Sequence, residues 1–309
     1  MGTLGGGGPQ TLFGYKCCDP NAHVGLAAGL GPDLPPPCMD WFRTNDIDTA
    51  ALTPHPTAPT PRAWQIVEKD GRRHEIWRTE RTKTQEAMLL PPFTSIPPSL
   101  QQARGLHVAV NPSIAPFELL QQIRDTGNPD VTISVETFCN AANPMNKSAI
   151  SKLVSLCDVF SPNTEEAMSM LGICPGSMNG NSSNDNIKDI KRLMDPFMDL
   201  GAKVMVLRRG AAGAVVAARS TASPQTVKYW SVSAVPNIDV IDTTGCGNAF
   251  CGAFMAKLMG GGREKEAAVA GCAAASVVAE HRGIPPGSIA QNYREEVRRR
   301  EGLVQVKAI

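Results

Sequence analysis

The sequence of 309 residues predicts an α/β fold in which a mostly parallel sheet is covered by helices on both faces. Short β-branched runs alternate with segments of helical periodicity over most of the chain, which is typical of repeated β-α-β units. Polar or glycine-rich turns follow several predicted strands, and such sheets bind ligands beyond the carboxyl ends of their strands. The length is compatible with one large domain or two smaller ones.

The amino-terminal part of the chain is less regular. Its expected elements are a short helix at 10–15, a buried strand at 24–28 and a short helix near 39–42. Two β-prone runs, 63–67 and 74–78, flank the pair Asp70-Gly71, and Asp-Gly between such runs is a strong hairpin signal. We therefore expect a β-hairpin at about 62–79.

The rest of the chain carries the regular alternation. The expected strands lie at 106–110, 131–135, 158–161, 203–207, 214–218 and 237–241. The expected helices lie at 116–124, 148–156, from 163 onward, and at 187–200, 249–259, 264–281 and 291–301. The segment 174–185 is rich in glycine, serine and asparagine and predicts a surface loop. In this order Asn163, the loop around Gly210 and the turn at 242–248 all follow strands, so one cleft can contain all three.

The turn at 242–248 has the composition of an anion site. Gly245 and Gly247 let backbone N–H groups converge, and the following helix adds the positive end of its dipole. A phosphate group or a developing alkoxide suits such a turn. Glycine-rich turns that serve only as helix entries are about equally common, so the turn alone leaves both interpretations open.

The composition restricts the classes of binding partner and the cellular compartment that we expect. The 30 basic and 29 acidic residues give a net charge of +1, so no global field recruits nucleic acid or a membrane surface. The nine cysteines are scattered without metal-ligand spacing, which favours reduced thiols. No signal-peptide pattern and no apolar run of about 18 residues occurs. We therefore expect a cytoplasmic protein, with neither nucleic acid nor membrane as a partner.

Four motifs occur in the order that is typical of one family. The turn 242–248 (Asp-Thr-Thr-Gly-Cys-Gly-Asn) resembles a D-T-x-G-A-G-D signature, and 163–166 (Asn-Thr-Glu-Glu) resembles an N-x-x-E magnesium motif. Residues 206–213 resemble a strand with a G-x-x-G nucleotide loop, and the glycine-rich segments 5–8 and 29–33 resemble a substrate motif. From residue 5 to about 286, the chain thus resembles the PfkB-type, ribokinase-like family of sugar and nucleoside kinases.

Within that family the chain is most similar to a fungal group that includes the yeast maintenance-of-killer protein. This closer resemblance rests on the sequence at 247–250 and on the helix end at 279–283. The family resemblance implies a single three-layer, ribokinase-like domain over 1–309, with the hairpin as a small β lid. It also implies ATP and Mg²⁺ as cofactors, and a homodimer or a protein partner is compatible with the lid.

The resemblance further implies roles for particular residues. The anion hole would be formed by Thr244, Gly245, Cys246 and Gly247. Substrate would lie against Gly6, Gly7 and Gly8, and the nucleotide against Gly210 and Gly213. Asn163 and Glu166 would hold Mg²⁺ through water, since hard oxygen ligands suit that ion. The same N-x-x-E spacing is that of a helix capping box, and both interpretations can hold together.

Several positions depart from the family pattern. Asn248 stands where the family places its catalytic base, and a carboxamide cannot accept a proton at neutral pH. Asp242 is a conceivable substitute base, although a carboxylate that holds the turn is the simpler interpretation. In the family, a first strand with an acidic residue usually precedes the glycine-rich segment with which this sequence begins, so we expect either that this strand is absent or that the start of the chain is abbreviated. Glu136 stands where the family often has Asp after a strand, and it is given no role.

Two functions therefore compete. The first is ATP-dependent phosphoryl transfer to a hydroxyl of a small sugar, polyol or nucleoside, weakened by Asn248. Positioning and charge stabilisation carry much of phosphoryl-transfer catalysis, so loss of the base does not abolish it. The alternative is a nucleotide-binding pseudokinase with a regulatory or assembly role.

Overall fold

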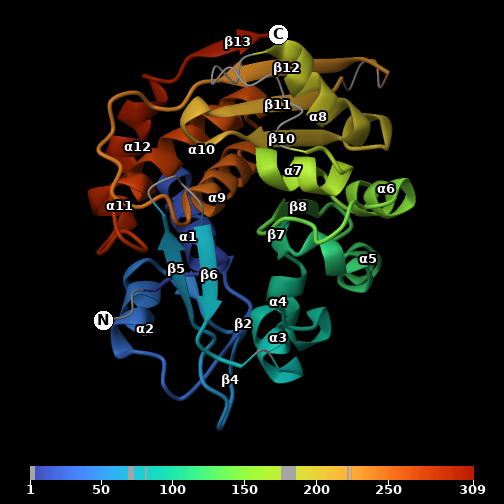
Figure 1. The fold of residues 1–309 in the computed structure, drawn as a ribbon. Coiled ribbons are helices and arrows are strands. Elements are labelled where there is room, and N and C mark those ends of the chain that lie inside the picture. The colour runs from blue at the N-terminus through green and yellow to red at the C-terminus, as the bar shows by residue number, and fades with distance from the viewer. Residues whose placement is uncertain (1–3, 69–72, 81, 175–185, 221–222, 224) are drawn as a thin grey trace.

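A seven-stranded sheet forms the middle layer of the computed structural model (Figure 1), which describes residues 4–68, 73–80, 82–174, 186–220, 223 and 225–309. The strands lie in the order β13-β12-β11-β10-β9-β8-β7. They are β7 (Gly105–Val110), β8 (Thr132–Thr137), β9 (Val159–Ser161), β10 (Val204–Arg208), β11 (Ala214–Arg219), β12 (Val227–Val232) and β13 (Val306–Ala308). Strands β7 to β10 are mutually parallel, whereas β10 to β13 pair antiparallel.

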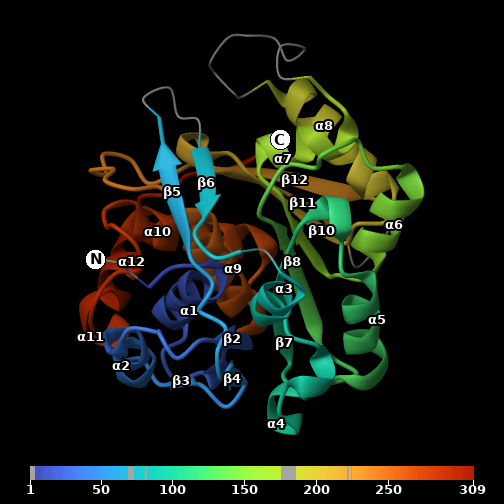
Figure 2. The same ribbon diagram turned by 60° about the horizontal axis from the view of Figure 1, so that its bottom comes forward.

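Helices cover both faces of this sheet (Figure 2). One face carries α5 (Phe117–Thr126), α6 (Lys147–Ser155), α7 (Thr164–Leu171) and α8 (Ile187–Asp199). The other carries α1 (Gly7–Cys18), α9 (Cys246–Met259), α10 (Glu264–Ala279), α11 (Ile289–Asn292) and α12 (Arg294–Glu301). Successive side chains of β10 point to opposite faces of the sheet. Met205 and Leu207 join the hydrophobic core under α5 to α8, and Val206 joins the core under α9 and α10. The predicted α/β fold with helices on both faces is confirmed.

Helices α1 and α9 pack closely through small residues. A Cβ on Gly14 would lie 1.9 Å from the carbonyl oxygen of Ala249, and one on Gly252 would lie 1.8 Å from that of Thr11. Only glycine allows two helix backbones to approach this far. The beginning of α1 is therefore fixed beside the beginning of α9.

The amino-terminal region is built from short elements outside the large sheet. Two parallel pairs join β1 (Val24–Gly25) to β3 (Ile47–Asp48) and β2 (Ala28–Leu30) to β4 (Leu52–Pro54). The helices here are α2 (Pro36–Thr44), α3 (Lys83–Leu89) and α4 (Pro98–Gln101). The predicted buried strand at 24–28 is wrong, since two half-buried strands, β1 and β2, lie there instead.

The predicted hairpin is present as β5 (Ala63–Val67) and β6 (Arg73–Trp77), which pair antiparallel. Its Asp-Gly turn lies outside the described residues, as does the predicted loop from 175 to 185. Trp64 and Ile76 face each other across the pair and are exposed to 54% and 45%. Its role as a lid stays a prediction.

The expected strand at 237–241, just before the glycine turn, is wrong. Val240 and Ile241 are more than half exposed. The backbone N–H groups of Ile241 and Asp242 both donate to the carbonyl of Ala279, at the end of α10. These hydrogen bonds replace a strand ladder, so the turn is anchored on a helix rather than on the sheet.

None of the described helices is both long and apolar enough to cross a bilayer.

Candidate active site

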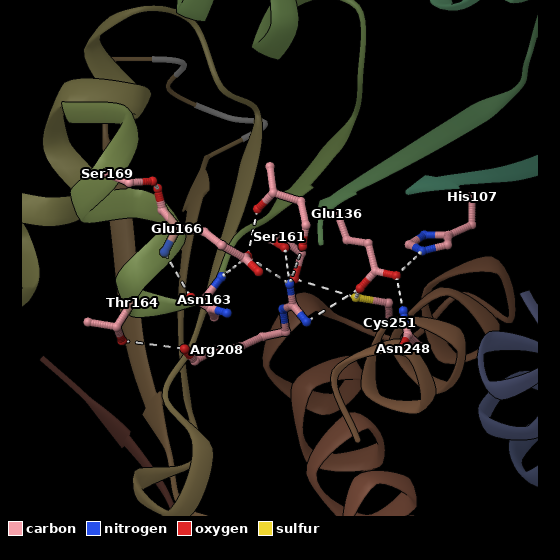
Figure 3. A network of polar contacts seen from close by, with 11 residues as sticks. His107, Glu136, Ser161, Asn163, Thr164, Glu166, Ser169, Arg208, Asn248 and Cys251 are labelled. Carbon is pink, nitrogen blue, oxygen red and sulfur yellow. Dashed lines mark hydrogen bonds and ion pairs between the residues drawn. The ribbon is translucent and has the colours of Figure 1, made fainter. Parts of the chain in front are cut away.

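A buried network of polar side chains lies where β8, β9 and β10 end and where α7 and α9 begin (Figure 3). Parallel strands bring their carboxyl ends to one edge of the sheet, which explains why residues far apart in sequence meet here. The side chains that form it are His107, Glu136, Thr137, Ser161, Asn163, Glu166, Arg208, Asn248 and Cys251. The predicted Asn163, Glu166 and Asn248 are therefore brought into one site.

The glycine turn has the geometry expected of a helix start. Asp242 Oδ1 accepts a hydrogen bond of 2.8 Å from the backbone N–H of Thr244, so this carboxylate holds the turn. Gly245 is the N-cap of α9, with a left-handed φ of 88°. Among the described residues, no side chain caps this helix. The N–H of Cys246 donates to the carbonyl of Thr243, at 3.2 Å, so the N–H groups of Gly247 and Asn248 are the ones available to an anion.

Arg208, at the end of β10, adds a positive charge beside this turn. A Cβ on Gly247 would lie 2.0 Å from Arg208 Nη1, so the guanidinium packs directly against that glycine. Arg208 Nη2 donates to the carbonyls of Thr137 and Ser161, at 3.1 and 2.9 Å. Its Nε is buried and receives no partner from the described residues. A buried N–H without a partner is uncommon and suits a site that accepts an anionic group.

Asn163 and Glu166 form the capping box that their spacing allows. Asn163 is the N-cap of α7 and its side chain accepts from the backbone N–H of Glu166, at 2.9 Å. In return Glu166 Oε2 accepts from the backbone N–H of Asn163, at 2.8 Å, and from the hydroxyl of Thr137, at 2.6 Å. Burial raises the pKa of Glu166, although Arg208 Nη2, 3.3 Å away, opposes this. The capping interpretation is present in the fold, whereas magnesium contact stays a prediction.

Glu136, at the end of β8, lies at the centre of the network and was given no role from the sequence. It is 1% exposed, and its Oε1 accepts a hydrogen bond from Asn248 Nδ2. His107 Nε2 lies 3.3 Å from Oε1, and Arg208 Nη1 lies 3.4 Å from Oε2. Burial acts to raise the pKa of Glu136, but His107, Arg208 and Asn248 outweigh it and lower the pKa to about 2. The carboxylate is therefore ionised at neutral pH.

His107, Glu136 and Cys251 are near enough to one another to resemble a metal-binding group. The positive guanidinium of Arg208 and the amide of Asn248 already occupy the carboxylate of Glu136. Burial raises the pKa of Cys251 well above its ordinary value, so it is a thiol rather than the thiolate that metals prefer. These three residues are better explained as part of the hydrogen-bonded network.

The remaining predicted residues lie around this network. Gly7, in the first turn of α1, faces Asn248: a Cβ there would lie 3.1 Å from Nδ2. Gly210 and Gly213 belong to the loop that follows Arg208, and a Cβ on Gly213 would lie 2.1 Å from the carbonyl of Val232. The close packing of the loop on β12 thus explains Gly213 without a nucleotide. A Cβ on Gly210 would meet nothing within 4 Å.

Two site residues that sequence reasoning did not assign, Glu136 and Arg208, share a feature that is visible in the sequence. Glu136 and Arg208 are charged residues at the carboxyl ends of strands that are otherwise buried. Such a charge needs a partner, which makes it a candidate site residue.

Two surface hollows of about 480 and 430 Å³ lie elsewhere, beside α5 and between α9 and α12, and neither is lined by a predicted site residue.

Comparison with known proteins identifies a family and similar sequences. Residues 37–288 match the model of the pfkB family carbohydrate kinases. An uncharacterised protein of Schizosaccharomyces pombe is 25% identical over 300 residues, which cover 91% of this chain and 79% of that protein. A cytidine kinase of Thermococcus kodakarensis is 23% identical over 239 residues, covering 76% of this chain and 73% of that enzyme.

Solved structures support the same fold. Arabidopsis thaliana ribokinase, complexed with ribose and ATP, has a TM-score of 0.69 at 18% identity and covers 96% of this chain and 87% of its own. A putative ribokinase II of E. coli, in complex with ATP and Mg²⁺, has a TM-score of 0.65 at 17% identity and covers 95% and 88%. The match of the family model to most of the sequence means that this chain belongs to the PfkB family of carbohydrate kinases.

Proposed function

We propose that this chain transfers the γ-phosphoryl group of ATP to a hydroxyl of a small sugar, polyol or nucleoside, at a low rate. The observation that carries the proposal is the packing of the Arg208 guanidinium against Gly247, in the first turn of α9. The uncapped N–H groups of α9 and this guanidinium both direct positive charge to one point. Stabilising the charge of a phosphoryl group in transfer requires such an arrangement.

The residues present fit ATP and Mg²⁺ in different ways. The unpaired Nε of Arg208 and the start of α9, with Thr244, Gly245, Cys246 and Gly247, suit phosphate oxygens. Gly210, which has open space around it, suits the nucleotide. Asn163 and Glu166 offer oxygen atoms, but Glu166 Oε2 already accepts several hydrogen bonds, so contact with Mg²⁺ would run through water. When bound, Mg²⁺ neutralises charge on the phosphates.

Asn248 sets the expected rate. Its amide can orient a substrate hydroxyl but cannot take its proton, and a positioned base is worth roughly 10² to 10⁴-fold. Asp242 is the candidate substitute, with one oxygen engaged by the N–H of Thr244. Glu136 is a poor candidate base, because it is buried and its pKa is about 2.

The substrate class is proposed from the surroundings of Asn248 and from similar proteins. Gly7 faces Asn248, and Gly6 has open space around it, which supports a hydroxyl-bearing ligand at the start of α1. A Cβ on Gly8 would lie 2.4 Å from Leu26 Cδ1, so close packing explains Gly8. The relatives named above include a cytidine kinase and a ribokinase complexed with ribose. The exposed Trp64, Ile66 and Ile76 support the hairpin as a lid, and also as a surface for a second copy of the chain.

One observation favours the alternative, a nucleotide-binding pseudokinase with a regulatory or assembly role. The amide of Asn248 is bonded to Glu136, so the residue at the position of the family base serves the internal network. A site can keep its anion-binding turn after losing the base. This alternative shares nucleotide binding with the first function and differs from it only in turnover.

Two measurements test the proposal. Calorimetry should detect Mg-ATP binding by wild type, and Gly247→Val should weaken it at least tenfold, because the added side chain displaces Arg208. Gly260→Ala, at the other end of α9, is the control and should leave affinity unchanged, because it lies away from Arg208 and its Cβ, 3.3 Å from the carbonyl oxygen of Ala256, requires only a small local shift. Absence of ATP binding at millimolar concentration contradicts both functions. Turnover with ribose, cytidine or related compounds then separates the kinase from the pseudokinase.

A further inference from the structure

The amide of Asn248 has a defined orientation because of what it faces. Glu136 is an ionised carboxylate and can only accept hydrogen bonds, so Nδ2 of Asn248 must be the atom that points toward it. The other amide atom, Oδ1, is directed away from Glu136. Within the described part of the chain, no group donates a hydrogen bond to Oδ1. An acceptor is thus left free at the position where a substrate hydroxyl would lie.

We propose that Glu136 is the positioning residue of Asn248: it fixes the amide with its carbonyl oxygen toward the substrate and excludes a carboxylate from position 248. Glu136 and Asn248 are therefore one matched pair, in which the negative charge resides on β8 and the neutral group on α9. The part of this inference that concerns substrate rests on the proposed function. The pairing itself does not.

Charge around the pair explains the exclusion. The groups that face Glu136 are His107 from β7, Arg208 from β10, and Asn248 and Cys251 from α9. Arg208 also faces Glu166 from α7, so one guanidinium already serves two carboxylates. Aspartate at 248 would add a third carboxylate at hydrogen-bonding distance from Glu136. Two carboxylates that share a site cannot both remain ionised, and one must take up a proton.

This pairing changes the expected effect of restoring the family's aspartate at position 248. Asn248→Asp alone puts the base in its usual place but sets it against Glu136. A shared proton then blocks the lone pair that should accept the proton of the substrate hydroxyl. Exchanging the two groups, with Asn248→Asp and Glu136→Gln together, keeps one carboxylate and one amide in contact. The double variant is therefore the one that tests the missing base.

Thermal unfolding at pH 8 and pH 5 tests the pairing without any ligand. Asn248→Asp should lower Tm at pH 8 by roughly 6 to 12 °C, because like charges meet in a buried site. At pH 5 at least half of this loss should return, since a shared carboxyl proton has a raised pKa in the folded state and is lost as pH rises. The double variant should lie within about 3 °C of wild type at pH 8.

Asn146→Asp is the matched control. Asn146 caps α6, where its side chain accepts from the N–H of Ala149, and aspartate caps a helix as well as asparagine does. Its Tm should show no pH-dependent loss. Glu136→Gln measured alone at both pH values accounts for the part of any pH dependence that comes from the loss of the Glu136 carboxylate itself.

The outcomes are distinct. The inference is overturned if Asn248→Asp is as stable as wild type at pH 8, or if adding Glu136→Gln brings no recovery. Should Asn248→Asp fail to fold, recovery in the double variant supports the pairing and its absence contradicts it. Phosphoryl transfer should rise tenfold to a hundredfold in the double variant and less in Asn248→Asp. If no variant turns over ATP while the Tm pattern holds, the proposed function fails and the pairing stands.

Discussion

Glu136 and Glu166 are two buried carboxylates that face the same guanidinium, yet their pKa values shift in opposite directions. Glu136, at the end of β8, has Asn248 and His107 at one oxygen and Arg208 at the other, and its pKa falls to about 2. Glu166, in the first turn of α7, receives its hydrogen bonds on Oε2, and burial raises its pKa.

The difference shows that burial does not by itself decide the charge of a carboxylate. What decides it is the number of positive or donating groups at each oxygen, and the distance to the next carboxylate. Glu136 also acts on Glu166 as a like charge and raises its pKa further. The single guanidinium of Arg208 therefore leaves Glu136 and Glu166 with different affinities for a proton.

Removing the shared cation should have the largest effect. Arg208→Met leaves two buried carboxylates facing each other, and loss of one partner of a buried ion pair typically costs about 3 to 5 kcal/mol. Urea denaturation at pH 7 measures the change in the free energy of unfolding. Arg299→Met, which removes an exposed guanidinium paired with Glu296, is the control and should cause little change. Equal effects of the two substitutions would mean that Arg208 does not hold the carboxylates.

The two carboxylates should respond to pH with opposite slopes. Lowering the pKa of Glu136 from 4.5 to about 2 corresponds to about 3 kcal/mol of stability above pH 4.5, which is lost as the pH falls toward 2. The gap in unfolding free energy between wild type and Glu136→Gln should therefore shrink in acid.

The raised pKa of Glu166 gives the reverse expectation. Its stabilising contribution is complete below the unfolded-state pKa of the carboxyl group and is lost as the pH rises from there through the folded pKa. The gap between wild type and Glu166→Gln should be largest at low pH and smaller at high pH. Denaturation from pH 2 to pH 8 compares the two variants, because the Glu136 contribution changes only in the acid part of this range. Parallel slopes would show that the carboxylates are equivalent after all.

The smallest effect is expected from Thr137→Val. It removes the hydroxyl that donates to Glu166 Oε2 but keeps the shape of the buried side chain, at a cost of about 1 to 2 kcal/mol. With one donor gone, the pKa of Glu166 should rise further. Thr126→Val removes an exposed hydroxyl bonded within α5 and serves as the control. A Thr137 variant as stable as this control would show that the hydroxyl does not matter.

The sequence predicted the parallel half of the sheet well because helices of clear periodicity separate its strands: α5 lies between β7 and β8, α6 between β8 and β9, and α7 and α8 between β9 and β10. The expected strands at 106–110 and 203–207 agree with β7 and β10 to within one residue. β12 and β13 were not predicted. Residues 237–241 have strand-like composition, but their hydrogen bonds go to the end of α10, which composition does not reveal.

The local motifs of the candidate site were predictable from the sequence, whereas the contacts between residues of different strands were not. The glycine turn, Asn163 and Glu166 lie together because each follows or caps an element that the sequence identifies. The neighbourhood of Glu136 and Arg208 depends on the lateral order of strands β8, β9 and β10, which a single sequence does not state. Asn248 was predicted as the decisive residue, whereas its hydrogen-bond partner was not.

The packing of α1 on α9 also bears on the order in which this chain can fold. Gln10 Nε2 donates to the carbonyl of Thr244, across a separation of 234 residues. During synthesis α1 emerges early, but the surface that covers Phe13 and Cys17 is made only much later. Contacts of such separation slow folding, while β7 to β10 and their helices involve mostly nearer neighbours. We therefore expect a nascent chain that stops before α9 to hold an ordered sheet while α1 stays available to chaperones.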